Sequence, residues 1–252
     1  MGFFRRIATV ATVLLLGHNA ARAQPAVSIE LALLVDVSGS VNAAEFALQR
    51  DGYVNVFRDA SIWNAFGGSG RTMAVTYGQW ASFNRQSLIT GGTNGWFFIN
   101  NAATANTFAD AIAGMTRAFS GGTDPGSAID WIRPKFGQNF TGLRKIIDVS
   151  GDGQGEDDTA AKRDAAQAAG FTINGLAIGG TAITNWYTAN LKTTDGFVIG
   201  VDDFADFNSA IRTKIGREVD VPVGVVPEPS TYLLMASGLV GLAIVARRRR
   251  QE

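Results

Sequence analysis

Apolar residues along the chain recur in two periods that alternate with each other. Residues 28–35 form an almost continuous apolar run, which is typical of a strand buried on both faces of a sheet. Residues 43–58 follow with aromatic and aliphatic side chains at helical spacing, and the alternation continues to about residue 215. It predicts strands at 28–35, 71–81, 96–99, 143–149, 171–178 and 197–201, and helices at 43–58, 102–119, 125–133, 159–169 and 204–215.

Strands that alternate with helices over about 190 residues predict a single α/β domain. We expect a Rossmann-like, doubly wound fold with a mainly parallel sheet flanked by helices. In such sheets, ligands bind beyond the carboxyl ends of the strands, at the point where the strand order reverses. The polar loops that follow strands are therefore the places where we expect a functional site.

The first 23 residues have the pattern of a secretory signal peptide. Arg5 and Arg6 precede a short apolar run, and the segment ends in the small-x-small sequence Ala21-Arg22-Ala23. The pattern predicts cleavage before Gln24. A membrane-anchoring first helix is the alternative, but the apolar run is too short to span a bilayer.

The carboxyl-terminal residues form a second ordered pattern. Pro227-Glu228-Pro229 precedes an uncharged stretch at 230–246, and four arginines follow at 247–250. These parts, in this order, resemble the PEP-CTERM sorting signal of exported bacterial proteins. The resemblance implies a linker at 220–226, a signal at 227–252 with a short transmembrane helix at 231–246, and cleavage near Pro227 by a transpeptidase-like exosortase. The arginines would hold that end in the cytoplasm, so the chain is anchored at least transiently; a permanent tail anchor is the alternative.

The composition excludes several classes of site. The chain has no cysteine, and its one histidine, His18, lies in the predicted signal peptide. The mature protein would therefore lack cysteine-containing zinc sites, cysteine nucleophiles, disulfides and Ser-His-Asp triads. The whole chain has a formal net charge of zero, but residues 24–226 alone carry about −5. An acidic domain argues against nucleic-acid binding, which needs a basic surface.

Three polar loops offer oxygen donors beyond predicted elements. The first strand is followed by Asp36-Val37-Ser38-Gly39-Ser40, which can turn one carboxylate and two hydroxyls toward one point. Thr123 precedes the helix predicted at 125–133, and Asp152 follows the strand predicted at 143–149. Oxygen ligands without nitrogen or sulfur favour Mg²⁺, Mn²⁺ or Ca²⁺ over zinc or copper. The loops together predict a divalent-cation site.

These loops resemble those of the von Willebrand factor A domain, whose metal-ion-dependent adhesion site combines an Asp-x-Ser-x-Ser sequence with a threonine and an aspartate. The resemblance extends over residues 28–216 and indicates a domain at 24–219. More narrowly, residues 35–41, 48–51, 147–153 and 172–176 resemble an exported bacterial subfamily, the domain of unknown function 1194.

The resemblance implies a role for each loop residue. Ser38 and Ser40 would ligate the cation directly, and Asp36 and Asp152 would do so directly or through water. Thr123 would join them when a ligand is engaged. An open position on the cation would accept an acidic side chain from a partner.

Several residues keep alternative interpretations. Thr123 could instead cap the helix that follows it. Asp148, inside the predicted strand, competes with Asp152 as a ligand, although a structural role suits its position better. The acidic residues 156–158 suit a solvated helix start or a second cation site. The tryptophans could form a sugar-stacking surface or, among apolar neighbours, occupy the core; they are Trp63, Trp80, Trp96, Trp131 and Trp186.

These features together predict a non-enzymatic, metal-dependent binding or adhesion module, exported to the cell surface or the extracellular matrix. Its partner would be a protein or matrix ligand that offers an acidic group to Mg²⁺, or to Mn²⁺ or Ca²⁺. A metal-assisted hydrolase is one alternative, since two carboxylates near a cation could activate water. A structural biofilm scaffold without metal function is the other.

Overall fold

The computed structural model describes residues 24–155 and 158–220. The predicted signal peptide, the sorting signal with its helix at 231–246, and linker residues 221–226 lie outside the described residues. Within the described part of the chain, no helix combines the length and apolar character needed to cross a bilayer.

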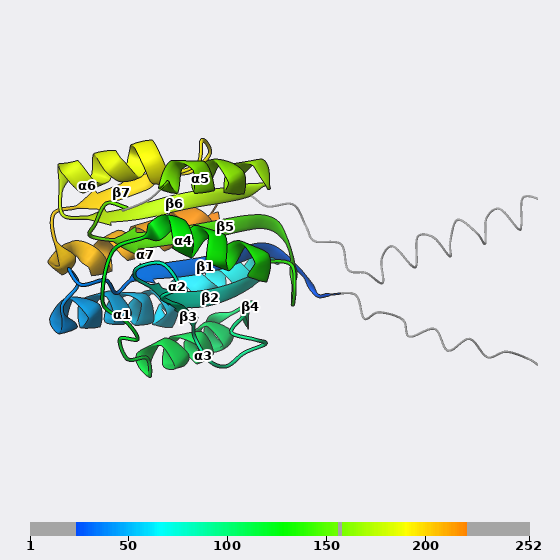
Figure 1. Cartoon of the computed structure of the whole chain (residues 1–252). Coiled ribbons are helices and arrows are strands. Elements are labelled where there is room, and N and C mark those ends of the chain that lie inside the picture. Colours follow the sequence, from blue (N-terminus) through cyan, green and yellow to red (C-terminus); the bar gives the residue numbers. More distant parts are fainter. Residues whose placement is uncertain (1–23, 156–157, 221–252) are drawn as a thin grey trace, which may run out of the picture.

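Within those residues, a seven-stranded sheet forms the middle of the domain (Figure 1). The strands from β2 to β7 along the main path are parallel neighbours, whereas β3 and β4 pair antiparallel with β2. The predicted α/β class with a mainly parallel sheet is confirmed. In sheet order, the strands are β3 (Gln86–Leu88), β2 (Met73–Trp80), β1 (Ala26–Asp36), β5 (Thr141–Gly151), β6 (Phe171–Ile178) and β7 (Val198–Val201), with β4 (Phe97–Ile99) beside β2.

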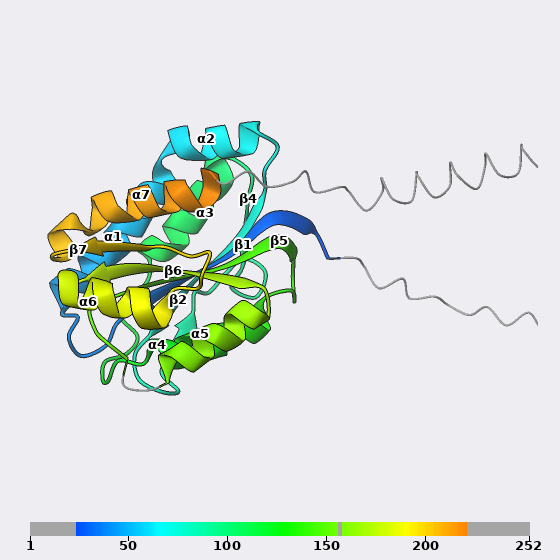
Figure 2. The same ribbon diagram turned by 90° about the horizontal axis from the view of Figure 1, so that it is seen from above.

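Helices cover both faces of the sheet (Figure 2). One face carries α1 (Ala43–Arg58), α2 (Ala60–Gly68), α3 (Ala102–Ala113) and α7 (Phe207–Asp220). The other carries α4 (Pro125–Ile132), α5 (Thr159–Ala168), α6 (Thr181–Trp186) and the π-helical turn Tyr187–Leu191.

Strand β1 explains why its sequence is apolar without interruption. Leu31 and Leu33 point into the core beneath α1 and α7, whereas Ala32 and Leu34 point into the core beneath α4. Because successive side chains of a strand alternate between faces, a strand covered on both sides needs apolar residues throughout.

The structure shortens one predicted helix and adds elements that were not predicted, among them β3, α2 and α6. The helix predicted at 102–119 ends at Ala113, with Gly114 as its C-cap, although Met115 and Phe119 still pack on the core beside it. Helix α2 has only nine residues and ends in Gly67 and Gly68, and glycine is a poor helix former, so its sequence gives a weak helical signal.

The strand order reverses at β1. The chain passes from β1 to β2 on one side and later returns to β5 on the other side of β1. Asp36 at the end of β1 therefore lies beside the end of β5, where Val35 is in register with Ser150. This is the place in a doubly wound sheet where ligands bind.

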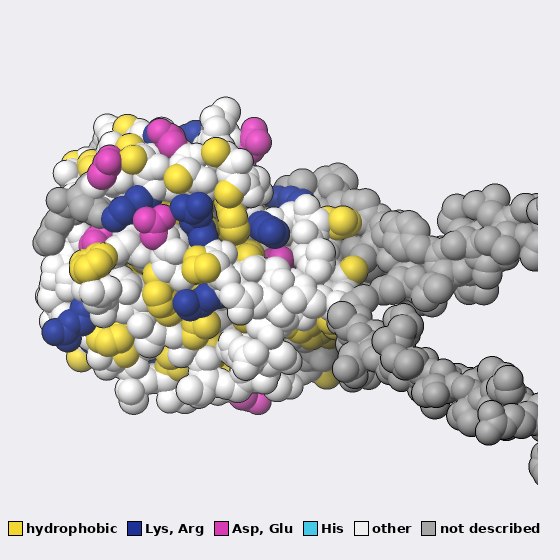
Figure 3. All heavy atoms as spheres, turned by 45° about the vertical axis from the view of Figure 1, so that its right-hand side comes forward, with side chains coloured by type: hydrophobic (Ala, Val, Ile, Leu, Met, Phe, Trp, Pro, Cys, Tyr) yellow, Lys and Arg dark blue, Asp and Glu magenta, His cyan; other side chains and the backbone are white. Residues whose placement is uncertain are grey.

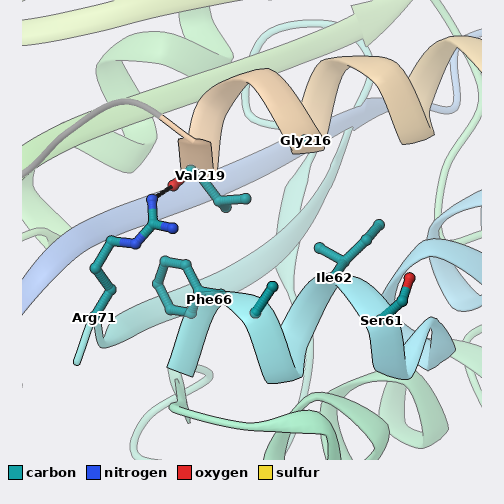
Figure 4. Close-up of a pocket in the computed structure, with 7 residues that line it drawn as sticks. Ser61, Ile62, Phe66, Arg71, Gly216 and Val219 are labelled. Carbon is teal, nitrogen blue, oxygen red and sulfur yellow. Dashed lines mark hydrogen bonds between the residues drawn. The ribbon is translucent and has the colours of Figure 1, made fainter. Parts of the chain in front are cut away.

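Both ends of the described domain lie near the amino-terminal ends of the parallel strands, opposite their carboxyl ends. Arg71, just before β2, donates to the carbonyl of Val219, and Arg144 near the start of β5 donates to the carbonyl of Glu218. A pocket of about 190 Å³ between α2 and α7 lies at this same edge (Figure 4); Arg71, Phe66 and Val219 contribute to its walls. The end of α7 is thus far from the carboxyl ends of the strands.

Candidate metal centre

The first loop is organised by Asp36, the last residue of β1. Its side chain is fully buried, and its Oδ1 accepts a hydrogen bond of 2.7 Å from the backbone N–H of Ser38. Gln49 of α1 donates to the Asp36 carbonyl at 3.1 Å. The tight turn leaves the Ser38 and Ser40 hydroxyl oxygens 3.1 Å apart.

The second loop packs directly on the first. The Thr123 hydroxyl donates to Ser38 Oγ at 3.2 Å, and the N–H of Gly39 donates to the carbonyl of Gly121 at 2.7 Å. Gly121 has a φ of +131°, which favours glycine at this position. The two loops are therefore joined through both side chain and backbone.

The third loop closes the group. The Ser40 hydroxyl donates to Asp152 Oδ1 at 2.7 Å. Gly153 lets this loop approach the second one, because a Cβ there would lie 2.9 Å from Thr123 Cγ2. The structure thus links four of the predicted side chains by hydrogen bonds at the carboxyl ends of the strands, and Asp36 joins them through the backbone N–H of Ser38; the four are Ser38, Ser40, Thr123 and Asp152.

Arg117 supports the first loop and was not predicted. Its guanidinium donates to the carbonyl of Val37 at 3.0 Å and to the carbonyl of Ser38 at 2.5 Å. It can reach them because α3 ends at Ala113 and the chain beyond it turns toward the site. The sequence carried no signal for this role, since 102–119 was interpreted as one continuous helix.

The interpretation of Thr123 as a helix cap is wrong. The N-cap of α4 is Asp124, whose side chain accepts a hydrogen bond of 2.7 Å from the N–H of Ser127. Because Asp124 makes this contact, the Thr123 hydroxyl is left to face Ser38.

Asp148, the competing carboxylate, belongs to a different cluster. It is fully buried and ion-paired with Lys214 of α7, which also binds Glu218 at 3.0 Å. Asn174 of β6 donates to Glu218 at 2.7 Å. The carboxylate of Asp148 is thus engaged by a lysine in the core beneath α7 rather than by the hydroxyls of the loops.

The two loop carboxylates lie in an environment that disfavours their negative charge. Burial raises the pKa of Asp36 from 3.8 to about 7, and the nearby Asp152 adds to this, while the hydrogen bonds from Ser38 oppose it. Burial also raises the pKa of Asp152, which the Ser40 hydroxyl partly offsets. A positive ion at the site would reverse this penalty.

The donor set fits a hard divalent cation. Asp36 Oδ2 is buried without a hydrogen-bond partner among the described residues, so one carboxylate oxygen is still available to a ligand. Two carboxylates and three hydroxyls supply only oxygen, which is the donor chemistry of Mg²⁺, Mn²⁺ and Ca²⁺. Within the described residues, no group of three or more histidine or acidic side chains is placed so that it could hold a metal ion.

A pocket lies between the turn after β2 and helix α4. Its volume is about 280 Å³, and Phe83, Ser127 and Trp131 contribute to its walls. Phe83 is 68% exposed on the turn after β2, whose Ala81 carbonyl accepts a hydrogen bond from Asp124. The turn that carries this exposed aromatic side chain is therefore joined by a backbone hydrogen bond to the residue after Thr123.

The structure bears on part of the remaining interpretations, those of the acidic residues 156–158 and of the tryptophans. Glu156 and Asp157 lie outside the described residues, and Asp158 is the N-cap residue of α5. Three of the five tryptophans belong to the core, and the other two pack partly buried against it. The buried ones are Trp63, Trp80 and Trp96, and the partly buried ones are Trp131 and Trp186.

Charged side chains are mixed on the face of the molecule shown in Figure 3. Basic and acidic groups are interspersed there among uncharged areas. The basic groups do not form one continuous patch.

Comparison with known families identifies the chain. Residues 26–223 match the family described as "Protein of unknown function (DUF1194)". The chain belongs to this family. Residues 225–250 of this DUF1194 protein match the PEP-CTERM protein-sorting motif. A search of curated proteins found no match.

Solved structures similar to the DUF1194 protein have the von Willebrand factor A fold. Proximal thread matrix protein 1 from the mussel byssus is 15% identical with a TM-score of 0.59, and the match covers 76% of this chain and 48% of that one. A von Willebrand factor type A protein from Catenulispora acidiphila is 17% identical with a TM-score of 0.50, covering 77% and 43%. The chain thus spans about half the length of these proteins, and the predicted resemblance in fold is confirmed.

The mussel protein has also been solved "with zinc occupied MIDAS motif". That structure is 16% identical to the DUF1194 chain with a TM-score of 0.52, and the match covers 78% of this chain and 45% of the mussel protein.

Proposed function

We propose that this protein is an exported binding module that holds one divalent cation and uses it to bind an acidic group of a protein or matrix ligand. The observation that carries the proposal is the meeting of three loops, whose hydroxyl and carboxylate groups are linked by hydrogen bonds beside the buried Asp36. The residues that would hold the cation are Asp36, Ser38, Ser40, Thr123 and Asp152. When bound, the cation would supply a positive centre with an exchangeable position for a partner carboxylate.

The site's chemistry favours Mg²⁺ or Mn²⁺, with Ca²⁺ as a further candidate. The zinc-occupied motif of the mussel protein supports a divalent cation in this fold. In the present chain the donors are all oxygens, and hard cations prefer such a set over zinc.

Binding is better supported than hydrolysis. The described domain contains no histidine, the side chain that acts most often as a general base. A partner carboxylate at the cation requires no such base. We therefore propose a non-enzymatic function. A metal-assisted hydrolase is the second hypothesis, and a metal-independent scaffold is the third.

The position of the site suits a tethered molecule. The end of α7 lies at the opposite edge of the sheet from Asp36 and Asp152, and the sorting motif follows it in the sequence. A chain held through that end would turn its cation site outward, toward the matrix or a neighbouring cell.

We expect export to leave two new chain ends. The small-x-small sequence predicts that the mature chain begins at Gln24, and the sorting motif predicts processing near Pro227. Intact-mass measurement of the protein released from its host tests both ends. If all surface material retains the arginines at 247–250, the processing claim fails and a permanent anchor replaces it.

We expect ligand binding to require the cation. The mature protein, immobilised and exposed to host extracellular material, should retain ligand in MgCl₂ and release it in chelator. Asp152→Ala should retain nothing in either buffer. The matched control is Asp164→Ala, which removes an aspartate with a 68% exposed side chain and should behave as wild type. Equal retention by wild type with and without chelator would contradict metal-dependent binding.

A further inference from the structure

The Tyr187 side chain packs against β6 and β5 at two positions where each strand has a glycine. It is the first residue of the π-helical turn and is fully buried. A Cβ at Gly175 of β6 would lie 2.8 Å from Tyr187 Cδ1, and a Cβ at Gly151 of β5 would lie 2.7 Å from its hydroxyl oxygen. Neither position could carry a larger side chain without moving the ring. The two glycines therefore allow the hydroxyl to reach the end of β5.

The hydroxyl reaches the same small space as the carboxylate of Asp36. The point 2.7 Å from the Tyr187 hydroxyl, where a Gly151 Cβ would lie, is also 2.7 Å from Asp36 Oδ2. Both atoms are buried, and neither has a hydrogen-bond partner among the described residues. A phenol keeps its proton at neutral pH, so the hydroxyl is a donor. An unused donor thus stands beside an unused acceptor.

We infer that Tyr187 is a positioning residue of the cation site, whose hydroxyl donates a hydrogen bond to Asp36 Oδ2, directly or through one water. This inference rests on the proposed cation function. A carboxylate oxygen has two lone pairs, so Oδ2 can accept this bond and still face a cation. The bond stabilises the ionised carboxylate and fixes its orientation, as hydrogen bonds to metal ligands do in metal sites generally.

The same helical segment also contacts the loop that carries Asp152. The Trp186 and Tyr187 rings meet edge to face at 5.8 Å. A Cβ at Gly155 would lie 3.0 Å from Trp186 Cη2, so the indole packs against the loop that follows Asp152. Consecutive residues of one segment thus touch two of the three loops. A π-helical turn at this position is consistent with a functional role, since such turns occur frequently at functional sites.

The test compares two tyrosine-to-phenylalanine variants by calorimetric titration with MgCl₂. Tyr187→Phe should raise the Kd for Mg²⁺ by about 10- to 100-fold with unchanged stoichiometry, the usual cost of losing a partner of a metal ligand. Tyr77→Phe is the matched control: its hydroxyl is also buried without a partner, but it lies in the core beneath α1 and α7. That variant should bind Mg²⁺ as wild type does.

A second readout separates positioning from a structural role. In chelator, Tyr77→Phe should melt at or above the wild-type temperature, because it loses a buried hydroxyl that has no partner. Tyr187→Phe, which loses one hydrogen bond, should remain folded and melt only slightly below wild type. Addition of MgCl₂ should produce a tyrosine ultraviolet difference spectrum in wild type and Tyr77→Phe that is lost in Tyr187→Phe. Gly151→Ala, which places a methyl group between the two oxygens, should also weaken Mg²⁺ binding.

The outcomes distinguish a failure of the role inferred for Tyr187 from a failure of the proposed cation-binding function. If wild type binds Mg²⁺ and Tyr187→Phe binds it equally well, the positioning role is wrong and the cation site stands. If Tyr187→Phe only lowers the melting temperature and leaves the Kd unchanged, Tyr187 is structural and the inference is likewise overturned. If wild type itself does not bind Mg²⁺, the proposed function fails.

Discussion

Replacing Lys214 by methionine is expected to lower the free energy of unfolding by about 3–5 kcal/mol, because it leaves buried carboxylates without their cation. Lys214 is fully buried between Asp148 and Glu218, both of which are also inaccessible to solvent. Urea unfolding of the variant and of wild type measures the difference. Lys192→Met is the control, since the Lys192 amine contacts a backbone carbonyl instead of a buried carboxylate.

The loss of stability in Lys214→Met should grow with pH. Burial raises the pKa of Asp148 from 3.8 to about 7, and the charge of Lys214 opposes that rise. Because the folded state holds this proton more tightly than the unfolded state, Asp148 lowers the free energy of unfolding as pH rises from about 4 to 7. Without Lys214 the folded pKa is higher, so the decline should continue above pH 7. Adding Asp148→Asn should recover part of the lost stability; a variant as stable as wild type at pH 8 would contradict this account of the cluster.

Replacing Asp36 by asparagine is expected to abolish stabilisation by Mg²⁺ and to raise stability in chelator. A cation that binds only the folded state stabilises it by about 2.7 kcal/mol at a hundredfold excess over Kd, and the variant should show none of this gain. In chelator at pH 8, wild type must keep a buried carboxylate ionised beside Asp152, whereas asparagine avoids that charge. Melting curves with and without MgCl₂ measure both effects.

The control for Asp36 is Asp164→Asn, on the exposed surface of α5. It should keep the full Mg²⁺-dependent shift and the wild-type melting temperature in chelator. A shift retained by Asp36→Asn would mean that the cation binds elsewhere.

Much of the fold could be predicted because its signals are local. Strand β1 is apolar throughout since it is covered on both faces, and the order of strands and helices follows from the change of period. The limits of α3 could not be predicted in this way. Met115 and Phe119 continue the helical spacing and do pack on the core, but the chain that carries them is no longer helical after Gly114.

The residues of the candidate site likewise differ in whether a local sequence pattern predicts them. Asp36, Ser38 and Ser40 could be placed because they directly follow a recognisable strand. Arg117 and Tyr187 could not, since each acts through contacts with residues far away in sequence, and neither lies in a distinctive local pattern. The sequence predicted donors; the residues that hold those donors in place became visible only in three dimensions.

The most direct test of the central claim is calorimetric titration of the mature wild-type domain with MgCl₂ and, separately, with MnCl₂. We predict one cation per chain, with binding abolished in Asp36→Asn and in Asp152→Asn and retained in Asp164→Asn. The absence of both binding heat and a melting shift in wild type at millimolar metal would contradict the cation site, and the protein would then be a scaffold without metal function.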